Sequence, residues 1–335
     1  MAKRKRRRGF PVILCVLLSL LAAGAAAGYT GYSWLNEKYD AAMHPYYTSE
    51  AVKKLAPGSF EYKFAEKKLG TAALESMRAE ESSMPAAEGS GRADIVIEPG
   101  VKDVNGDGIV IDHIYGGTYE GYMMIVEDPS QVFIAVNPHL GSGGPAPMLD
   151  DYVDYFDAVG GINGGGFEDV GGNGDGSIPA GIVIQDGRLI SGGAPQPILG
   201  LTRDHKLVTT TASGEQALAM GVVEAVTFGP TFIENGRVVY TPTANLNMLN
   251  PRTAVGQQAD GTMLLLVIDG RGPSSFGAKY EDVIEIFQKY EAVNAGNLDG
   301  GNSSVMIYNG KYVHYPVSMY NSRNLPSVVL VRGKD

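Results

Sequence analysis

Three two-residue turns place the strongest constraint on the fold of this chain. Asp186-Gly187, Asn235-Gly236 and Asn309-Gly310 each separate two β-rich runs. An Asp or Asn followed by Gly readily adopts the positive φ angles of a tight hairpin turn. Each dipeptide therefore predicts a β-hairpin, and three hairpins indicate a strand-dominated domain.

Helices are expected at only a few places. The run KYEDVIEIFQKYEA carries apolar residues at Val283, Ile286 and Phe287, the spacing of a helix with one buried face. An apolar strand precedes it and another follows it, and two shorter helices are expected to begin at Met148 and Gly214. We therefore predict an α+β fold, a strand-rich mixed sheet domain with a few helices.

The first residues predict membrane targeting. Six Lys and Arg lie between Lys3 and Arg8, and an apolar run extends from Pro11 to Tyr29. Such a run is long enough to cross a bilayer as a helix. We favour an uncleaved signal anchor, although the alanines at 25–27 also resemble the cleavage site of a signal peptide.

This interpretation divides the chain into three parts. Residues 1–32 form a cytoplasmic basic tail and transmembrane helix, residues 33–91 a partly helical stalk, and residues 92–335 a domain of catalytic size. The expected location is the cell membrane, with a single crossing and the C-terminal domain outside the cell.

Charge and cysteine content limit the partners. Without the six N-terminal cations, the formal net charge of −10 becomes −16, which argues against binding nucleic acid by bulk charge. The single cysteine, Cys15, lies in the apolar run, so the exported part has neither disulfides nor thiolate chemistry. This favours a bacterial cell surface. Composition does not define an oligomeric state.

Metal and cofactor motifs are weak. Asp103, Asn105 and Asp107 followed by Gly108 match the first half of a calcium loop, but Ile114 stands where the bidentate Glu is needed. A turn leading into a strand explains the same residues. The chain has no HExxH, phosphate-loop or GxSxG motif. No cofactor is required, and a divalent cation is possible without a motif to support it.

Polar loops at strand ends carry the remaining chemistry. Each joins glycine to acids, arginines or amides, and sites are commonly built at such strand ends. Carboxylates suit sugar hydroxyls, and arginines bind phosphate through two parallel hydrogen bonds. Each Asp-Gly pair also has a plainer explanation as a turn. The loops are GINGGGFED (161–169), NPRTAVGQ (250–257), VIDGRGP (267–273), NLDGGNSS (297–304) and NSRNLPS (321–327).

Four of these motifs in this order resemble the phosphodiester glycosidase family. They are NGGGF, NPRTAVG, IDGR and NLDGGNSS, and the resemblance runs from about residue 107 to 331. The chain departs from the family pattern at Asn302 and Val305, and its anchor and stalk are similar to those of Gram-positive bacterial members. The resemblance implies cleavage of the bond between the anomeric carbon of a sugar and a phosphodiester oxygen, with a phosphoglycan as substrate.

A site follows from this resemblance and the loop chemistry. Asp299 is the first candidate for the carboxylate that activates water or attacks the anomeric carbon, with Asp269 second and Glu168 third. A phosphate leaving group needs little protonation, so the site must mainly stabilise its charge. Arg252 and Arg271 are expected to hold the phosphate, assisted by the backbone of Gly300 and Gly301 and the hydroxyls of Ser303 and Ser304. Asn163 and Asn297 are expected to hold sugar hydroxyls or to orient the acids, and Arg323 completes the expected substrate-binding set.

Two functions without catalysis also agree with the sequence. The same loops suit a protein that binds a phosphoglycan, or assists exopolysaccharide assembly, without turnover. The segment 103–112 and the stalk suit a calcium-stabilised adhesion protein. Release of sugar from a wall polymer would favour the enzyme, and a melting temperature indifferent to chelator would exclude calcium.

Overall fold

The computed structural model describes most of the chain after residue 93. The predicted basic tail, anchor and stalk all lie outside the described part. Within the described part, no helix is long and apolar enough to cross a membrane. The described residues are 94–100, 106–140, 144–169, 174–241, 248–271, 275–314 and 322–334.

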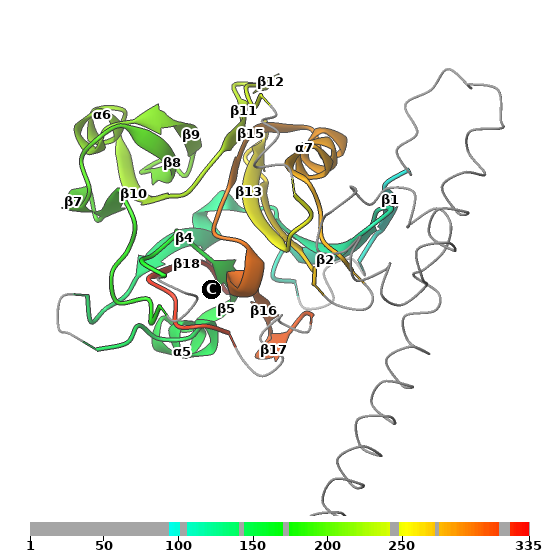
Figure 1. The fold of residues 1–335 in the computed structure, drawn as a ribbon, viewed down its shortest axis with the longest axis horizontal. Coiled ribbons are helices and arrows are strands. Elements are labelled where there is room, and N and C mark those ends of the chain that lie inside the picture. The colour runs from blue at the N-terminus through cyan, green and yellow to red at the C-terminus, as the bar shows by residue number, and fades with distance from the viewer. Residues whose placement is uncertain are drawn as a thin grey trace, which may run out of the picture.

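Three antiparallel sheets form the domain (Figure 1). The eight-stranded sheet has the order β1 (Val96–Glu98), β2 (Ile109–Tyr115), β3 (Glu120–Val126), β14 (Met263–Ile268), β13 (Arg252–Gln258), β15 (Ala292–Asn297), β11 (Thr231–Glu234), β12 (Arg237–Val238). One five-stranded sheet has the order β7 (Arg188–Ser191), β6 (Val183–Gln185), β10 (Val222–Thr227), β8 (Gln196–Thr202), β9 (Leu207–Ala212). The other has the order β17 (Lys311–Tyr312), β16 (Met306–Tyr308), β5 (Ala158–Asn163), β18 (Ser327–Arg332), β4 (Val132–Val136).

The hairpins and helices agree with the sequence predictions. β6 and β7, β11 and β12, and β16 and β17 each pair across their Asx-Gly turn. Asp186, Asn235 and Asn309 have φ angles of 50°, 49° and 49°, as these tight turns require. The α-helices within the described residues are α5 (Leu149–Tyr155), α6 (Gly214–Ala219) and α7 (Tyr280–Lys289). Short 3-10 turns also occur at η2 (Pro129–Gln131) and η4 (Gly301–Ser303).

The predicted mixed sheet is not found, because every strand pairing within the described residues is antiparallel. The strand, helix, strand unit is present, and its strands β14 and β15 run in the same direction. β13 lies between them and pairs antiparallel with both. The unit therefore connects two strands that are not neighbours.

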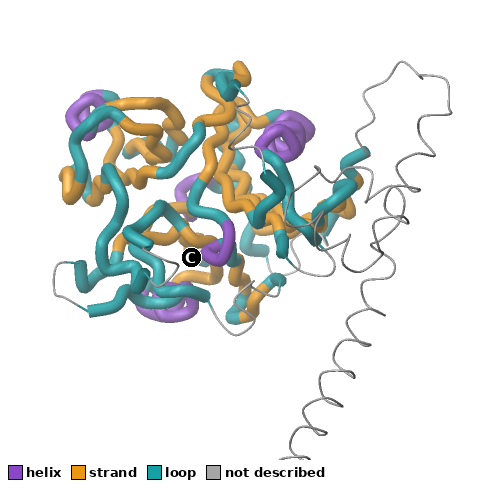
Figure 2. The backbone as a smooth tube through the Cα atoms, viewed as in Figure 1, coloured by secondary structure: helices purple, strands orange, loops and turns teal. Residues whose placement is uncertain are grey.

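Apolar layers cover both faces of the eight-stranded sheet. Helix α7 packs against one face through Val283, Ile286 and Phe287. On the other face, Val255 and Leu265 belong to a core shared with the two five-stranded sheets. All six residues of β14 are buried, which explains its unbroken apolar sequence. Figure 2 shows the three α-helices at the outside of the strands, whereas short helical turns also lie near the centre.

We expect Gly256→Ala to destabilise the domain through overpacking. A Cβ at Gly256 in β13 would lie 2.7 Å from the ring of Phe287, which is itself fully buried. Overpacking a core typically costs about 1–3 kcal/mol of unfolding free energy. Urea unfolding of the purified protein measures this cost. Gly193→Ala is the control, because a Cβ there meets nothing within 4 Å. Equal stability of the two variants would contradict this description of α7 packing.

Candidate active site

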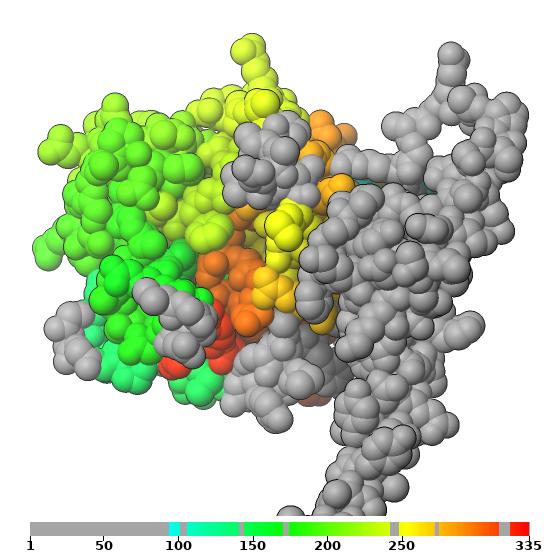
Figure 3. All heavy atoms as spheres, in the orientation of Figure 1, coloured from blue at the N-terminus to red at the C-terminus, as the bar shows by residue number. Residues whose placement is uncertain are grey.

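One edge of the eight-stranded sheet gathers the predicted loops. Asp269 directly follows β14, and Asp299 lies two residues after β15. Because both strands run antiparallel to β13, their ends emerge at the same edge, on either side of the start of β13. Figure 3 shows the yellow segment near residue 250 and the orange segment near residue 300 side by side on one face, with part of the green segment next to them.

A cavity of about 350 Å³ opens at this edge. Four of the five predicted loops contribute to its wall, and NPRTAVGQ contributes no lining residue. Two phenylalanines, two arginines and two carboxylates face the same space. The lining residues are Gly166, Phe167, Asp169, Ala180, Phe228, Arg271, Asp299, Gly300, Gly301, Asn302, Ser303 and Arg323.

Asn163 fixes the Asp299 loop from within the protein. Its side-chain amide donates to the carbonyl of Asp299 at 2.6 Å. Its Oδ1 accepts from the hydroxyl of Thr253 at 2.7 Å and from the backbone N–H of Val305 at 3.2 Å. Asn163 is fully buried. It therefore positions the Asp299 loop and does not line the cavity.

The glycines of NGGGF allow close backbone packing beside this loop. The backbone N–H of Asp299 donates to the carbonyl of Gly164 at 3.1 Å. A Cβ at Gly164 would lie 2.7 Å from the hydroxyl of Ser327, and a Cβ at Gly166 would lie 2.9 Å from the ring of Phe228. Side chains at these positions would separate the loops that form the cavity.

Asp299 has an unusual electrostatic environment. Burial raises the pKa of its carboxyl group to about 6, against the lowering effects of the Ser303 hydroxyl and the Arg323 cation. A carboxyl group with this pKa is largely ionised at neutral pH and can still accept a proton. These are the properties of a general base.

Asp169 is the opposite case in the same cavity. Both of its oxygens lie 2.8 Å from guanidinium nitrogens of Arg323. These hydrogen bonds lower the pKa of Asp169 to about 2. The Arg323 guanidinium also lies 4.9 Å from the ring centroid of Phe167. Two carboxylates whose pKa values are pushed apart can take different roles in one reaction.

Arg271 supplies a second cation to the cavity. Its guanidinium donates to the side-chain oxygens of Asn302 at 2.7 Å and Asn250 at 2.8 Å. A guanidinium has five N–H donors, and both of these partners are neutral. Arg271 therefore keeps its positive charge available to an anion that enters the cavity.

Arg252, which was expected to hold the phosphate, does not line the cavity. Its guanidinium donates to the carbonyls of Ala278 at 3.0 Å and Met248 at 2.6 Å. It also lies 4.0 Å from the ring centroid of Tyr280, and only 6% of the residue is exposed. The side chain extends to the α7 side of the sheet, where it stabilises the fold.

Asp269, the second catalytic candidate, is not among the residues that line the cavity. Its Oδ1 is 2.5 Å from Nδ1 of the buried His314. His314 Nε2 accepts the backbone N–H of Met306 at 3.1 Å, which leaves the ring proton on Nδ1 beside the carboxylate. Asp269 therefore connects the IDGR loop to β16 and does not line the cavity.

Glu168, the third candidate, is exposed and outside the cavity, and the adjacent Asp169 lines it instead. Phe167 forms an isolated β-bridge with Pro179, so the backbone here is extended and alternate side chains share a side. This alternation places Phe167 and Asp169 together and directs Glu168 away.

Three further residues predicted to bind substrate form hydrogen bonds within the protein. Asn297 is buried and donates to the carbonyl of Gly229 at 2.9 Å. The buried hydroxyl of Ser304 lies 3.1 Å from the hydroxyl of Thr253. The backbone N–H of Gly301 donates to the carbonyl of Pro251 at 3.0 Å and is not available to phosphate.

The structure thus brings part of the predicted set together and adds residues that the sequence prediction missed. The predicted residues that line the cavity are Asp299, Arg271, Gly300, Gly301, Ser303 and Arg323. The added ones include Asp169, Phe167, Phe228 and Asn302. Asp169 and Phe167 belong to the predicted loop GINGGGFED, so membership of that loop could have identified them as site residues.

The described residues offer no group of three or more His, Cys, Asp or Glu that could hold a metal ion. In the suggested calcium loop, residues 103 and 105 lie outside the described part. The carboxylate of Asp107 accepts the backbone N–H of Ile109 at 3.0 Å and the hydroxyl of Tyr308 at 2.6 Å. These bonds fit the alternative of a turn leading into a strand.

We expect Arg252→Ala to lower stability more than intrinsic activity. The substitution removes the donor of the Met248 carbonyl, one of the two donors of the Ala278 carbonyl and the Tyr280 contact, a cost of about 3 kcal/mol in unfolding free energy. Urea unfolding measures this cost, and turnover is normalised to folded protein. Unchanged stability with lost turnover would contradict this expectation and support the predicted role of Arg252 in phosphate binding.

Known proteins share sequence with this chain. Residues 156–332 match the family model described as phosphodiester glycosidase. N-acetylglucosamine-1-phosphodiester alpha-N-acetylglucosaminidase of Mus musculus is 29% identical over 229 residues, which cover 62% of this chain and 43% of the relative. An uncharacterised SPbeta prophage-derived protein of Bacillus subtilis is 33% identical over 100 residues, covering 29% of this chain and 16% of that protein. The chain spans less than half the length of these curated relatives.

A solved structure shares the fold. The catalytic domain of zebrafish N-acetylglucosamine-1-phosphodiester alpha-N-acetylglucosaminidase superposes with a TM-score of 0.56 at 21% sequence identity. The match covers 77% of this chain and 93% of that domain. The family model spans more than half of the chain and includes all the residues that line the cavity. The chain belongs to the phosphodiester glycosidase family.

Proposed function

We propose that this protein hydrolyses the glycosidic bond of a sugar-1-phosphodiester. Family membership and the names of the mammalian relatives support this reaction class. The observation that carries the proposal is the position of Asp299, a carboxylate with a raised pKa in a cavity that also presents two arginines. Proton transfer and anion binding are the two functions that the reaction needs.

The cavity wall suits both halves of such a substrate. Phe167 and Phe228 offer aromatic surface to the apolar face of a sugar ring. Arg271 and Arg323 offer planar donors to phosphate oxygens. Arg323 is already bonded to Asp169, so the phosphate would share or compete for this guanidinium.

Asp299 acts on the water in the proposed mechanism. The water oxygen bonds to the anomeric carbon while the bond from that carbon to the phosphate oxygen breaks. The electron pair of the broken bond remains on the phosphate, whose charge the two arginines stabilise. The water proton passes to the Asp299 carboxylate, and the products are a free sugar and a phosphomonoester.

The same carboxylate also suits direct attack on the anomeric carbon. A covalent sugar intermediate would then form, and water would release it in a second step. The two routes give opposite anomers as the first product. NMR of the product during early turnover distinguishes them, because direct water attack inverts the anomeric configuration and the covalent route retains it.

We further propose that the domain acts outside the cytoplasm on a surface or exported phosphoglycan. The basic and apolar N-terminal sequence supports export, as does the absence of cysteine after Cys15. Protease treatment of intact cells tests the location. An exported domain is degraded while a cytoplasmic marker survives, and protection of both would contradict export.

Asp299→Asn should reduce turnover by a factor of about 10² to 10⁴, the usual contribution of a general base. The full chain, purified in detergent, is assayed for sugar released from a sugar-1-phosphodiester. Asp154→Asn is the matched control, because that carboxylate is exposed on α5. Normal turnover of folded Asp299→Asn would refute the assignment. A wild-type protein that binds the glycan and releases no sugar would favour the binding protein without catalysis.

The pH dependence should follow Asp299. A general base must be ionised, so kcat/KM should rise with pH through about 6 and fall about tenfold per unit below it. Asp169, with a pKa of about 2, stays ionised throughout this range. Initial rates between pH 4 and 8 provide the measurement. Activity that increases as pH falls below 6 would instead identify Asp299 as a general acid.

A further inference from the structure

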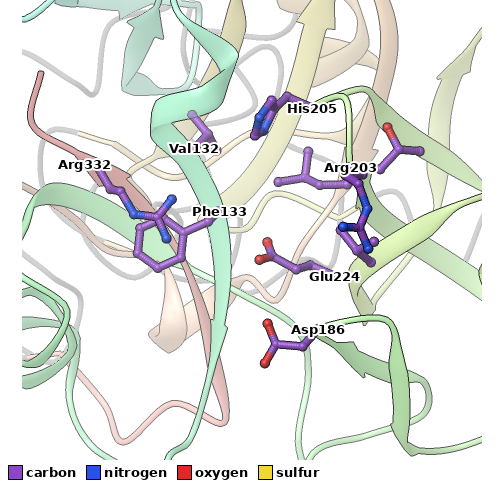
Figure 4. A pocket seen from close by; sticks show the side chains of 10 residues that line it. Val132, Phe133, Asp186, Arg203, His205, Glu224 and Arg332 are labelled. Atoms are coloured by element: carbon purple, nitrogen blue, oxygen red, sulfur yellow. The ribbon is translucent and has the colours of Figure 1, made fainter.

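A second cavity of about 310 Å³ lies away from the candidate active site (Figure 4). It opens where the edge strand β4 and the end of β18 meet β10 and the loops of the neighbouring five-stranded sheet. It shares no lining residue with the first cavity. Its lining residues are Val132, Phe133, Asp186, Leu201, Thr202, Arg203, His205, Val223, Glu224 and Arg332.

Glu224 stands at the centre of this cavity. Its Oε2 accepts the backbone N–H of Ile134 at 2.7 Å. Ile134 belongs to β4, the last strand of its sheet, which among the described strands pairs with β18 alone. The carboxylate therefore takes the place that a neighbouring strand would have. Burial raises the pKa of Glu224, while the cation of Arg332 opposes that shift. In Figure 4 the carboxylate points into the open space.

Two arginines border the same space. The guanidinium of Arg332 lies 3.8 Å from the ring centroid of Phe133, within the range of a cation–π contact. Among the described residues, neither Arg332 nor Arg203 has a carboxylate within ion-pair distance. Lys206, in the same turn as Arg203, is by contrast paired with Asp204 at 2.7 Å. The two guanidinium groups therefore keep their donors for an incoming anion.

We propose that this cavity is a second binding site, which takes an anionic sugar unit such as a sugar phosphate. Arg203 and Arg332 bind the anion, and Glu224 accepts from a hydroxyl or an acylamino N–H of the sugar. His205 borders the upper side of the space in Figure 4 and can add a further donor. Asp186 lies in an exposed turn at the rim and disfavours an anion that approaches from that side.

Strand β10 extends from the second cavity towards the first. Glu224 lies near the start of β10, and Phe228 of the first cavity directly follows its end. Four residues of extended strand span about 13 Å. A glycan that repeats sugar and phosphate can supply an anionic sugar to each cavity. This choice of ligand rests on the proposed function, whereas the existence of the binding site does not.

Binding to a catalytically silent protein tests the site directly. The full chain carrying Asp299→Asn is titrated with N-acetylglucosamine 1-phosphate by calorimetry, with inorganic phosphate in a parallel arm. We expect two sites per chain for the sugar phosphate. Arg203→Ala with Arg332→Ala should remove one of them, and Glu224→Gln should weaken that site about tenfold for the sugar phosphate and much less for inorganic phosphate.

Lys206→Ala in the same background is the matched control, because it removes a cation from the same turn that is already paired with Asp204. It should leave both sites intact. A single site in the parent protein that the double arginine substitution does not change would overturn the proposal. Equal losses in Lys206→Ala and the double variant would also overturn it, since general charge would then explain the binding.

Turnover distinguishes the source of the ligand. In the otherwise wild-type chain, the double arginine variant should lower kcat/KM on a phosphodiester-linked glycan polymer about tenfold and leave a single sugar-1-phosphodiester unaffected. The double arginine variant could instead match the wild type on both substrates while calorimetry confirms the second site. The ligand of that site would then be free sugar phosphate. Absence of turnover in the wild type would refute the proposed reaction, and the calorimetric result would still decide the second site.

Discussion

The hydrogen bond from the Asn163 side chain to the Asp299 carbonyl joins two sheets at the point where the site forms. Asn163 ends β5, whereas Asp299 follows β15 of the eight-stranded sheet. The other oxygen of this amide accepts from Thr253 of β13 and from Val305, which precedes β16. A buried amide with these partners fixes both sheet ends at once, because any displacement would leave buried polar groups without partners. The cavity depends on this connection, although Asn163 does not line it.

The electrostatic contrast between Asp299 and Asp169 follows from their surroundings. Asp299 lies in the wall and loses hydration, so its neutral form is favoured and its pKa rises. Asp169 lies at the rim, where Arg323 stabilises the ionised form through two hydrogen bonds. Because Arg323 faces both carboxylates, an anion that binds this guanidinium would weaken its support of each. Substrate binding and the proton affinity of Asp299 are thus physically coupled.

Local sequence patterns predicted the elements well and their side-chain directions poorly. The Asx-Gly turns and the apolar spacing of α7 act within a few residues, and all three hairpins and this helix are present. Grouping of the strand-end loops was also predictable, because several polar loops followed apolar strands. Strand order was not, since the insertion of β13 between β14 and β15 depends on contacts distant in sequence. Whether Glu168 or Asp169 faces the cavity likewise depends on which alternate side chains of the extended backbone share a side with Phe167.

The pleat of β13 explains why one arginine serves the fold and another the site. Residues on a strand alternate between faces, so Arg252 and Ala254 share the α7 side while Thr253 and Val255 face the opposite core. Arg271 lies beyond the end of β14 with a φ angle of 57°, where the chain has left the sheet and the pleat no longer dictates its direction. Charge alone made the two arginines equivalent candidates for phosphate. Their positions relative to a strand end make Arg252 part of the core and Arg271 available to the cavity.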